Sequence, residues 1–268
     1  MRTQHGESVL ARTVRILDAF TPEEPALTVS EISRRSGLHV ATASRLVAEL
    51  VSYGCLIRDD DRRVRIGMRL WELATRASPT LSLRNAAMPF MEGVHDVVGH
   101  HVQLGVLDGD EALFLERLTA PGAVINYTRV AGRLPLHASS IGLVLLAHGP
   151  ADLRRRVLDG CLHRYTPNTP ATAARLRAVL ADVRQQGYAY CPGYVHLEAL
   201  GVAAPVRDAR GEVVAALAVI VPNASEASSV VPVVRTAARG VSRALGAPVG
   251  PRRGREPGDS RDGRTTAV

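Results

Sequence analysis

The sequence contains no lysine. All 33 basic residues are arginine, and with 26 acidic residues they give a formal net charge of +7. A complete absence of lysine indicates a compositional bias, so the arginine content alone is weak evidence for nucleic-acid binding. The excess of arginines over acidic residues is small in both parts of the chain. Residues 1–77 hold 12 arginines and 10 acidic residues, and residues 78–246 hold 16 and 13. A DNA-binding interpretation therefore depends on where individual arginines lie, since local phosphate neutralisation drives binding.

Cysteines and long apolar runs are scarce as well. The three cysteines, Cys55, Cys161 and Cys191, form no C-x-x-C pair, which argues against a disulfide framework or a zinc knuckle. The start of the chain lacks an apolar signal segment, and the apolar stretch 213–222 is too short to span a bilayer. We expect a cytoplasmic protein with no membrane partner.

With 268 residues the chain is long enough for about two domains, and its N-terminal part predicts a helical one. Apolar residues repeat at helical spacing over 8–20. Thr28 and Glu31 form a capping-box pattern that opens a second, short helix ending at Gly37. A third helix is expected over 39–53.

The third of these helices has the pattern of a recognition helix. Its apolar face, formed by Ala43, Leu46, Val47 and Leu50, turns inward, and its opposite face is small and polar. A short helix, a turn containing Gly37, and a longer helix with an accessible N-terminal face suit a major groove about 12 Å wide. The alternative is a small α+β core whose arginines are ordinary solvated surface.

A β-hairpin is expected directly after the third helix, with strands at 55–58 and 63–66. Arg63 and Arg65 share one face of the second strand, which would allow both guanidinium groups to lie along phosphates. The turn carries three aspartates that would repel the DNA backbone. This wing is therefore expected not to insert its tip deeply into the minor groove.

The pattern beyond residue 67 predicts a linker and a larger α+β domain. Leu70, Leu73 and Ala74 indicate a linker helix, which Ser78-Pro79 breaks. The remainder predicts an antiparallel sheet flanked by helices. Helices are expected at 83–98, 138–148, 171–186 and 228–245, and strands at 101–107, 112–118, 124–130, 201–206 and 212–221.

Two stretches near the N-terminus resemble the helix-turn-helix domain of the IclR family of bacterial regulators: residues 27–38, LTVSEISRRSGL, and residues 42–46, TASRL. The resemblance implies that the start of the third helix faces DNA. Val40 and Ala41 stand where the family often has lysine and serine, so the operator sequence cannot be carried over from relatives. The candidate DNA-binding residues are Thr28, Arg34, His39, Val40, Ala41, Thr42, Ser44, Arg45, Arg63 and Arg65.

Residues 132–147, and residues 201–208 with Gly211, resemble the effector-binding domain of the same family, which implies a GAF-like fold enclosing a small organic effector. The resemblance covers about residues 8–246. Within it, His137-Ala138-Ser139-Ser140 opens a helix, where free N–H groups, the helix dipole and two hydroxyls favour a carboxylate. The alternative is that Ser139 only caps the helix and His137 only packs.

The other effector candidates lie mainly before the strand at 201–206. Relatives commonly have acidic residues followed by glycine in that stretch, whereas this chain has Gly193-Tyr194-Val195-His196-Leu197-Glu198. The chemistry of the pocket therefore cannot be carried over. The candidate effector-binding residues are Gln103, His137, Ala138, Ser139, Ser140, Tyr190, Cys191, Tyr194 and His196.

Several common enzyme motifs are missing from the sequence. It has no G-x-G-x-x-G after a strand, no G-x-x-x-x-G-K-[ST], no H-E-x-x-H and no G-x-S-x-G. Cys161 and His163 offer only two metal ligands in one loop. The rival interpretation is a small hydrolase with Cys191 as nucleophile and His196 or His137 as base. We expect no enzyme activity, no cofactor and no metal.

These patterns predict an α+β protein with a winged helix-turn-helix domain (8–67), a linker helix (68–82), a GAF-like effector-binding domain (83–246) and a disordered tail (247–268). The expected function is that of a DNA-binding transcriptional regulator, specifically a repressor of a catabolic operon. It would bind a pseudo-palindromic operator as a homodimer or homotetramer. A small, carboxylate-bearing organic effector would modulate that binding.

Overall fold

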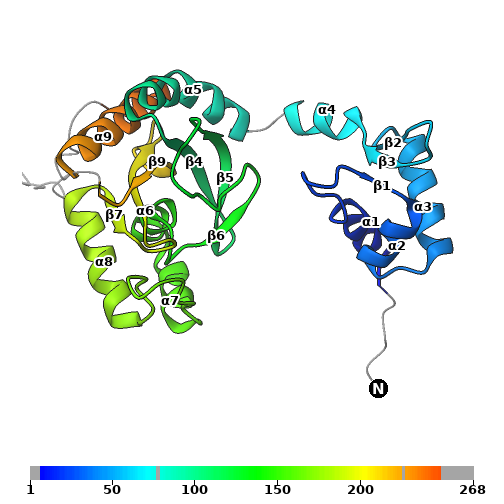
Figure 1. The fold of residues 1–268 in the computed structure, drawn as a ribbon, viewed down its shortest axis with the longest axis horizontal. Coiled ribbons are helices and arrows are strands. Elements are labelled where there is room, and N and C mark those ends of the chain that lie inside the picture. The colour runs from blue at the N-terminus through cyan, green and yellow to red at the C-terminus, as the bar shows by residue number, and fades with distance from the viewer. Residues whose placement is uncertain (1–6, 77–78, 225–226, 249–268) are drawn as a thin grey trace, which may run out of the picture. The chain divides into compact units, whose positions relative to one another are not determined.

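The computed structural model describes residues 7–76, 79–224 and 227–248. The chain forms two compact units that divide between Leu81 and Ser82 (Figure 1). Of the tail predicted to be disordered, all but Ala247 and Pro248 lies outside the described residues. Within the described ranges, no helix combines the length and the apolar character needed to cross a membrane.

The first unit packs three helices around one apolar core. These are α1 (Val9–Leu17), α2 (Val29–Ser36) and α3 (Val40–Ser52). Each presents the apolar side of its helical repeat inward, so that their buried side chains meet in one cluster. The cluster holds Ile16 of α1, Ile32 of α2, and Leu46 and Val47 of α3. The three predicted helices are confirmed.

Capping residues fix both ends of α2. Thr28 Oγ1 accepts a hydrogen bond from Glu31 N–H at 3.2 Å, and the Glu31 carboxylate accepts one from Thr28 N–H at 2.7 Å. The Thr28 N–H is also the largest cause of the lowered pKa of Glu31. Gly37 ends α2 with φ 63°, a left-handed conformation that favours glycine. The predicted capping box and glycine stop are confirmed.

A small antiparallel sheet completes the first unit. The predicted hairpin forms from β2 (Leu56–Arg58) and β3 (Val64–Ile66), and β1 (Ala26–Leu27), which the sequence did not indicate, pairs with the other edge of β3. The fully buried Val64 fixes the hairpin to the helical core. Helix α4 (Met68–Arg76) follows directly, where the linker helix was predicted, and the predicted helix break at Ser78 lies outside the described residues.

The second unit contains a six-stranded antiparallel sheet in the order β6-β5-β4-β9-β8-β7. Its long central strands form because apolar residues run through them almost without interruption, as expected of strands buried on both faces. The strands are β4 (His101–Asp108), β5 (Glu111–Leu118), β6 (Arg133–Pro135), β7 (Ala189–Pro192), β8 (Ala199–Arg207) and β9 (Val213–Pro222).

Helices cover both faces of this sheet, which confirms the predicted α+β layout (Figure 1). Helices α5 (Pro79–Val98) and α9 (Ala227–Ala244) pack against one face and share one apolar core with it. Helices α6 (Ser140–His148), α7 (Ala151–Asp159) and α8 (Ala173–Gln186) belong to a separate core on the other face. The sheet therefore separates two cores, and the side chains of each strand alternate between them.

The strand predicted at 124–130 is wrong. This segment is a loop, and the edge strand next to β5 is formed by β6 instead. Its alternating pattern reflects side chains that turn into the unit to make hydrogen bonds, since Thr128 is buried while Tyr127 and Arg129 are exposed. The period-2 pattern therefore has a cause other than strand pairing.

Two features of the helices also differ from the expectation. The helix predicted at 83–98 begins earlier, since Pro79 is the first residue of α5, a position where proline costs no hydrogen bond. Helix α7 was not predicted, because Leu153 is its only fully buried residue and its remaining side chains are largely polar. Amphipathic periodicity is weak in so short and charged a helix.

Candidate functional site

The first part of the site is the exposed N-terminal face of α3. His39 caps the helix, its Nδ1 accepting a hydrogen bond from Ala41 N–H at 3.3 Å. Val40, Ala41, Ser44 and Arg45 are exposed, and the remaining candidate of this helix, Thr42, is half-buried. Small residues on such a face leave the helix backbone accessible, which allows close approach of a DNA groove.

The first unit also carries exposed arginines with unpaired guanidinium groups. Among described residues, the side chains of Arg34 and Arg45 have no hydrogen-bond or ion-pair partner, and both are exposed. The same holds for Arg58 and Arg62 of the hairpin, which the sequence analysis did not select. Guanidinium groups without an internal partner are the ones free to neutralise phosphates.

The two predicted wing arginines are engaged within the unit. Arg63 donates to the backbone carbonyl of Ala26 at 2.9 Å and lies 3.6 Å from the Glu31 carboxylate. Arg65 pairs with Asp59 of the wing turn. The hydroxyl and N–H of the candidate Thr28 are used in the capping box. Of the turn aspartates, Asp59 thus neutralises Arg65, which the alternation pattern alone could not reveal.

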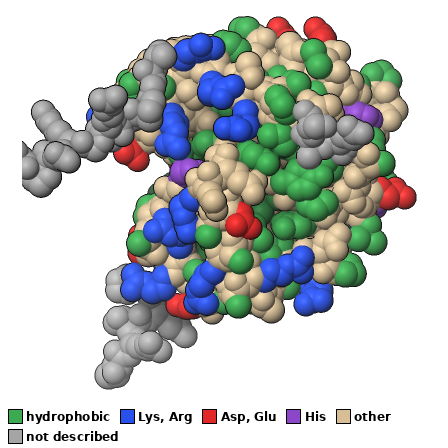
Figure 2. All heavy atoms as spheres, turned by 90° about the vertical axis from the view of Figure 1, so that its left-hand side faces the viewer, with side chains coloured by type: hydrophobic (Ala, Val, Ile, Leu, Met, Phe, Trp, Pro, Cys, Tyr) green, Lys and Arg blue, Asp and Glu red, His purple; other side chains and the backbone are tan. Residues whose placement is uncertain are grey.

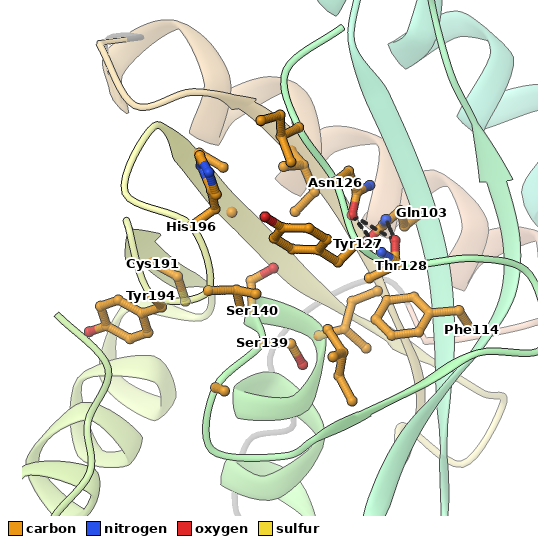
Figure 3. A pocket seen from close by; sticks show the side chains of 18 residues that line it. Gln103, Phe114, Asn126, Tyr127, Thr128, Ser139, Ser140, Cys191, Tyr194 and His196 are labelled. Atoms are coloured by element: carbon orange, nitrogen blue, oxygen red, sulfur yellow. Dashed lines mark hydrogen bonds between the residues drawn. The ribbon is translucent and has the colours of Figure 1, made fainter. Parts of the chain in front are cut away.

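The second part of the site is a pocket in the second unit, between α6, the sheet and two loops (Figure 3). It holds about 520 Å³ of space outside protein atoms, including the part open to solvent at its mouth. Seven of the nine predicted effector residues line it: Gln103, Ala138, Ser139, Ser140, Cys191, Tyr194 and His196. Its apolar wall includes Phe114, Leu134, Ile141 and Ile220.

The N-terminus of α6 presents unpaired hydrogen-bond donors to this pocket. Ser139 caps the helix, its Oγ accepting from Gly142 N–H at 3.0 Å. Ser140 is 4% exposed, and its hydroxyl has no hydrogen-bond partner among the described residues. The backbone N–H groups of Ser140 and Ile141 likewise donate to no other described group. These donors and the positive end of the helix dipole favour an anion.

Glycine brings the sheet close to this helix terminus. A Cβ atom at Gly201 of β8 would lie 3.0 Å from Ser140 Oγ, tighter than an ordinary van der Waals contact. The pocket floor at this point is therefore bare backbone, and Ser140 is held directly above it. The position has room for the serine only because no side chain occupies Gly201.

Aromatic rings lie at the outer end of the pocket. Tyr127, on the loop that was predicted to be a strand, has its ring centroid 5.9 Å from that of His196. Tyr194 also lines the pocket, and burial raises the pKa of its hydroxyl, which therefore stays protonated. Figure 3 shows Tyr127 extending across the pocket above Ser140.

Two predicted effector residues do not line the pocket. Tyr190 lies on β7 between Ala189 and Cys191, whose side chains belong to the α6 core, so strand alternation turns Tyr190 to the α5 and α9 core. His137 is buried, and its Nε2 bonds to the carbonyl oxygen of His163 at 2.9 Å. His137 thus holds the segment after α7 and stays away from the pocket.

The sequence analysis missed one whole side of the pocket. Ile125, Asn126, Tyr127 and Thr128 come from the loop after β5, and Val195 comes from the second loop. Because 124–130 was taken as a strand, its polar residues were not considered as pocket residues. Asn126 and Thr128, two residues apart in an apolar segment, were the available signal.

The hydrolase alternative has no support in the geometry. Cys191 is completely buried, and burial raises its pKa far above the ordinary thiol range, so the thiolate nucleophile is strongly disfavoured. Of the two candidate bases, His137 is bonded elsewhere, and His196, which lines the same pocket, would have only this buried thiol to act on. No group of three or more histidine, cysteine or acidic residues suited to a metal ion occurs in the described part of the chain.

The surface of the second unit carries no dominant charged region on the face seen in Figure 2. Arginine side chains are spread over this face, with acidic and apolar side chains among them. In the same unit, Arg156 is neutralised locally, because it pairs with both Asp110 and Asp152.

Together, the fold and the two parts of the site define a ligand-binding winged-helix protein, with a DNA-binding unit and a separate unit that holds a small-molecule pocket. Residues 9–60 match the IclR helix-turn-helix domain, and residues 75–243 match the bacterial transcriptional regulator IclR C-terminal domain. The chain therefore belongs to the IclR family of DNA-binding transcriptional regulators, as predicted, and it is not an enzyme.

Relatives match over most of their length. The HTH-type transcriptional regulator XynR of Escherichia coli (strain K12) is 32% identical over 246 residues, which cover 88% of this chain and 96% of XynR. A solved IclR homologue from Microbacterium hydrocarbonoxydans, in complex with 4-hydroxybenzoate, is 47% identical with a TM-score of 0.86, covering 89% of this chain and 99% of its own. Another, from Microbacterium sp. strain HM58-2, is 44% identical with a TM-score of 0.60, covering 91% and 100%.

Proposed function

We propose that this regulator represses a catabolic operon, that it binds a pseudo-palindromic operator as a homodimer or homotetramer, and that a small organic acid modulates this binding. Residues 8–67 would contact DNA, 68–82 would link the two domains and 83–246 would bind the effector. Because bacterial operators lie in the cytoplasm, the same proposal places the protein there. The observation that carries the proposal is the buried, unpaired Ser140 hydroxyl at the open N-terminus of α6.

The DNA-binding half of the proposal is supported by α3 and its surroundings. Arg34 and Arg45 present unpaired guanidinium groups, and the face between His39 and Ser44 is exposed and mostly small. Val40 and Ala41 offer apolar contact to a thymine methyl. Arg58 and Arg62 supply phosphate contacts that Arg63 and Arg65 would supply only after giving up their internal partners.

Self-association is supported by apolar side chains on the surface of the first unit. On α4, Met68 and Trp71 are 68% and 64% exposed, and Leu73 is exposed as well. On α1, Leu10 and Val14 are exposed. Large apolar side chains gathered on two short helices are unusual on a monomer surface and are suited to a second copy of the chain.

The proposal that the effector is an organic acid is supported by the chemistry of the pocket and by one relative. A carboxylate at the N-terminus of α6 would accept from the Ser140 hydroxyl and from two backbone N–H groups, and the apolar wall would hold the remainder of the molecule. The Microbacterium hydrocarbonoxydans homologue was solved with 4-hydroxybenzoate. Small aromatic acids are therefore the first class to test.

Titration of the full-length protein tests this proposal. Calorimetry with 4-hydroxybenzoate should show saturable binding, and fluorescence anisotropy with DNA from upstream of the gene and its neighbouring operon should show an operator affinity that changes with the acid. The uncharged 4-hydroxybenzamide is the matched control and should bind at least about 10-fold more weakly, because hydrogen bonds to a charged group are the stronger ones. Equal binding of acid and amide would overturn the carboxylate site.

A further inference from the structure

A chain of hydrogen bonds at one side of the pocket fixes the orientation of two amide side chains. The backbone N–H of Thr128 donates to Asn126 Oδ1 at 3.0 Å. A backbone N–H can only donate, so Asn126 must present its oxygen to Thr128. The Thr128 hydroxyl also lies 2.8 Å from this oxygen and therefore donates its single hydrogen to it.

The same logic fixes Gln103. The Thr128 hydroxyl has given its hydrogen to Asn126, so it can only accept from Gln103, which must present Nε2–H to it. The oxygen of the Gln103 amide is consequently turned away from Thr128. The position of the loop that carries Thr128 is held further by Arg117, which donates to the Thr128 carbonyl.

Two polar groups at the ends of this hydrogen-bond network have no partner among the described residues; one is an acceptor and the other is a donor. Gln103 is 1% exposed, and its Oε1 accepts no hydrogen bond from any described residue. Asn126 Nδ2 is buried and donates to no described partner. Both residues line the pocket, as Figure 3 shows. Asn126 Nδ2 has almost no accessible surface, which leaves the Gln103 oxygen as the group that a ligand can reach, and a ligand donor that paired with it would gain affinity.

These two groups lie across the sheet from the carboxylate site. Ser140 lies above Gly201 of β8, whereas Gln103 belongs to β4, and β9 lies between these two strands. Two strand spacings amount to roughly 10 Å. Ile220 of β9, the strand between them, lines the pocket, and Phe114 of β5 adds to its apolar wall beyond β4. That arrangement fits a ring-sized apolar body with one polar group at each end.

We propose that Gln103 binds a hydroxyl group at the end of the effector opposite its carboxylate, the hydroxyl donating to Gln103 Oε1. The inference rests on the proposed acid-binding function and narrows the effector to hydroxy acids. The α6 end supplies two backbone N–H donors and a hydroxyl that can donate, and so favours the carboxylate, while the Gln103 end offers a fixed acceptor and disfavours a second carboxylate. The pocket thus distinguishes the two ends of its ligand.

A matched ligand pair tests the hydroxyl requirement by calorimetry on the full-length protein. 4-Fluorobenzoate has the charge and nearly the size of 4-hydroxybenzoate but no hydrogen to donate. The wild-type protein should bind 4-hydroxybenzoate about 10- to 100-fold more tightly, because the fluoro compound leaves the Gln103 acceptor buried and unpaired. Equal affinity for the two compounds would overturn the hydroxyl site while leaving the acid site intact.

Two variants test which residues are responsible. Gln103→Met removes the acceptor at similar volume, and Thr128→Val removes the group that fixes the orientation of the amide. Each should reduce the preference for the hydroxyl compound to less than about 3-fold, with binding of 4-fluorobenzoate retained. Tyr190→Phe, which removes a hydroxyl on the opposite face of the sheet, is the control and should keep the wild-type preference.

The outcomes distinguish failure of the hydroxyl site from failure of the proposed acid-binding function. A preference that persists in both Gln103→Met and Thr128→Val overturns the assignment to Gln103, and circular dichroism melts identify a variant that has not folded. If neither compound binds the wild-type protein, the aromatic acid and the hydroxyl site are both overturned. If both bind and only the preference is missing, the hydroxyl inference alone fails.

Discussion

Two helix N-termini in this protein are suited to anions, and they differ in burial. The start of α3 is exposed, and its surroundings carry unpaired guanidinium groups. The start of α6 is buried in a pocket, and its unpaired groups are a serine hydroxyl and backbone N–H groups. An exposed terminus with mobile cations suits a long polyanion, whereas an enclosed terminus suits one small anion of defined shape.

If the effector is the proposed acid, this difference explains how one chain could bind two anionic ligands at separate sites. Exposed charges are screened by salt, so α3 needs several phosphates at once to bind tightly. Around α6 the local dielectric is low, so a few fixed donors suffice and no cationic side chain is needed there. The pocket excludes DNA by its size, and the surface of α3 holds small acids too weakly to matter.

Operator affinity and acid affinity should therefore respond to salt very differently, and this difference should be larger than the effect of any single substitution. Two copies of Arg34, Arg45, Arg58 and Arg62 would neutralise about eight phosphates, so operator affinity should fall roughly 10³- to 10⁵-fold between 50 and 200 mM salt. Affinity for 4-hydroxybenzoate should change by less than about 5-fold. Anisotropy and calorimetry over the same salt series measure both, and parallel losses would remove the distinction.

Arg45→Ala should give the next largest effect. Loss of one guanidinium from the exposed face of α3 should weaken operator binding about 10- to 100-fold, while acid binding stays unchanged. Arg177→Ala is the matched control, since Arg177 is an exposed arginine of α8 with the same charge. An unchanged operator affinity for Arg45→Ala would remove this residue from the interface.

The two serines at the start of α6 should separate ligand binding from stability. Ser140→Ala should weaken acid binding about 10-fold and leave the melting temperature nearly unchanged, because it removes a hydroxyl without a protein partner. Ser139→Ala should instead lower the free energy of unfolding by about 1 kcal/mol, because it removes the helix cap. Calorimetry and thermal melts on both variants check the pair. The reverse pattern would exchange the two roles.

Lowering the pH should destabilise the second unit, and this is the smallest of the predicted effects. His101 and His148 have lowered pKa values, chiefly because burial disfavours their charged forms. Below about pH 6.5 the unfolded chain takes up protons that the folded chain does not, so stability is full above that pH and falls as the pH drops below it. Urea midpoints at pH 7.5 and 5.5 should show this slope. His148→Gln should reduce it, and the exposed His163→Gln should not.

Local signals predicted the fold well where they acted within one element. The capping box at Thr28, the stop at Gly37 and the helix beginning near Ser139 depend on hydrogen bonds between neighbours in sequence, so residue types alone determine them. The loop at 124–130 could not be predicted in this way. Its alternating burial comes from contacts with Gln103 and Arg117, which are distant in sequence.

The same division holds for the site. The anion-binding end was predicted because its groups belong to a single helix start, and the placement of seven candidates in one pocket agrees with that reasoning. Tyr190 was misplaced because its strand, β7, was not assigned and its facing direction was unknown. Which wing arginines are free depended on pairing with Asp59 and Glu31, and only three-dimensional structure shows that.

The ring pair Tyr127 and His196 has a kinetic consequence. Both rings stand at the outer end of the pocket, and both belong to loops without regular secondary structure. A ligand seated against α6 would pass these rings on its way out, so substitutions at Tyr127 or His196 should change its dissociation rate more than those at the inner wall. If dissociation is slow, the DNA-binding response would outlast a brief fall in ligand concentration.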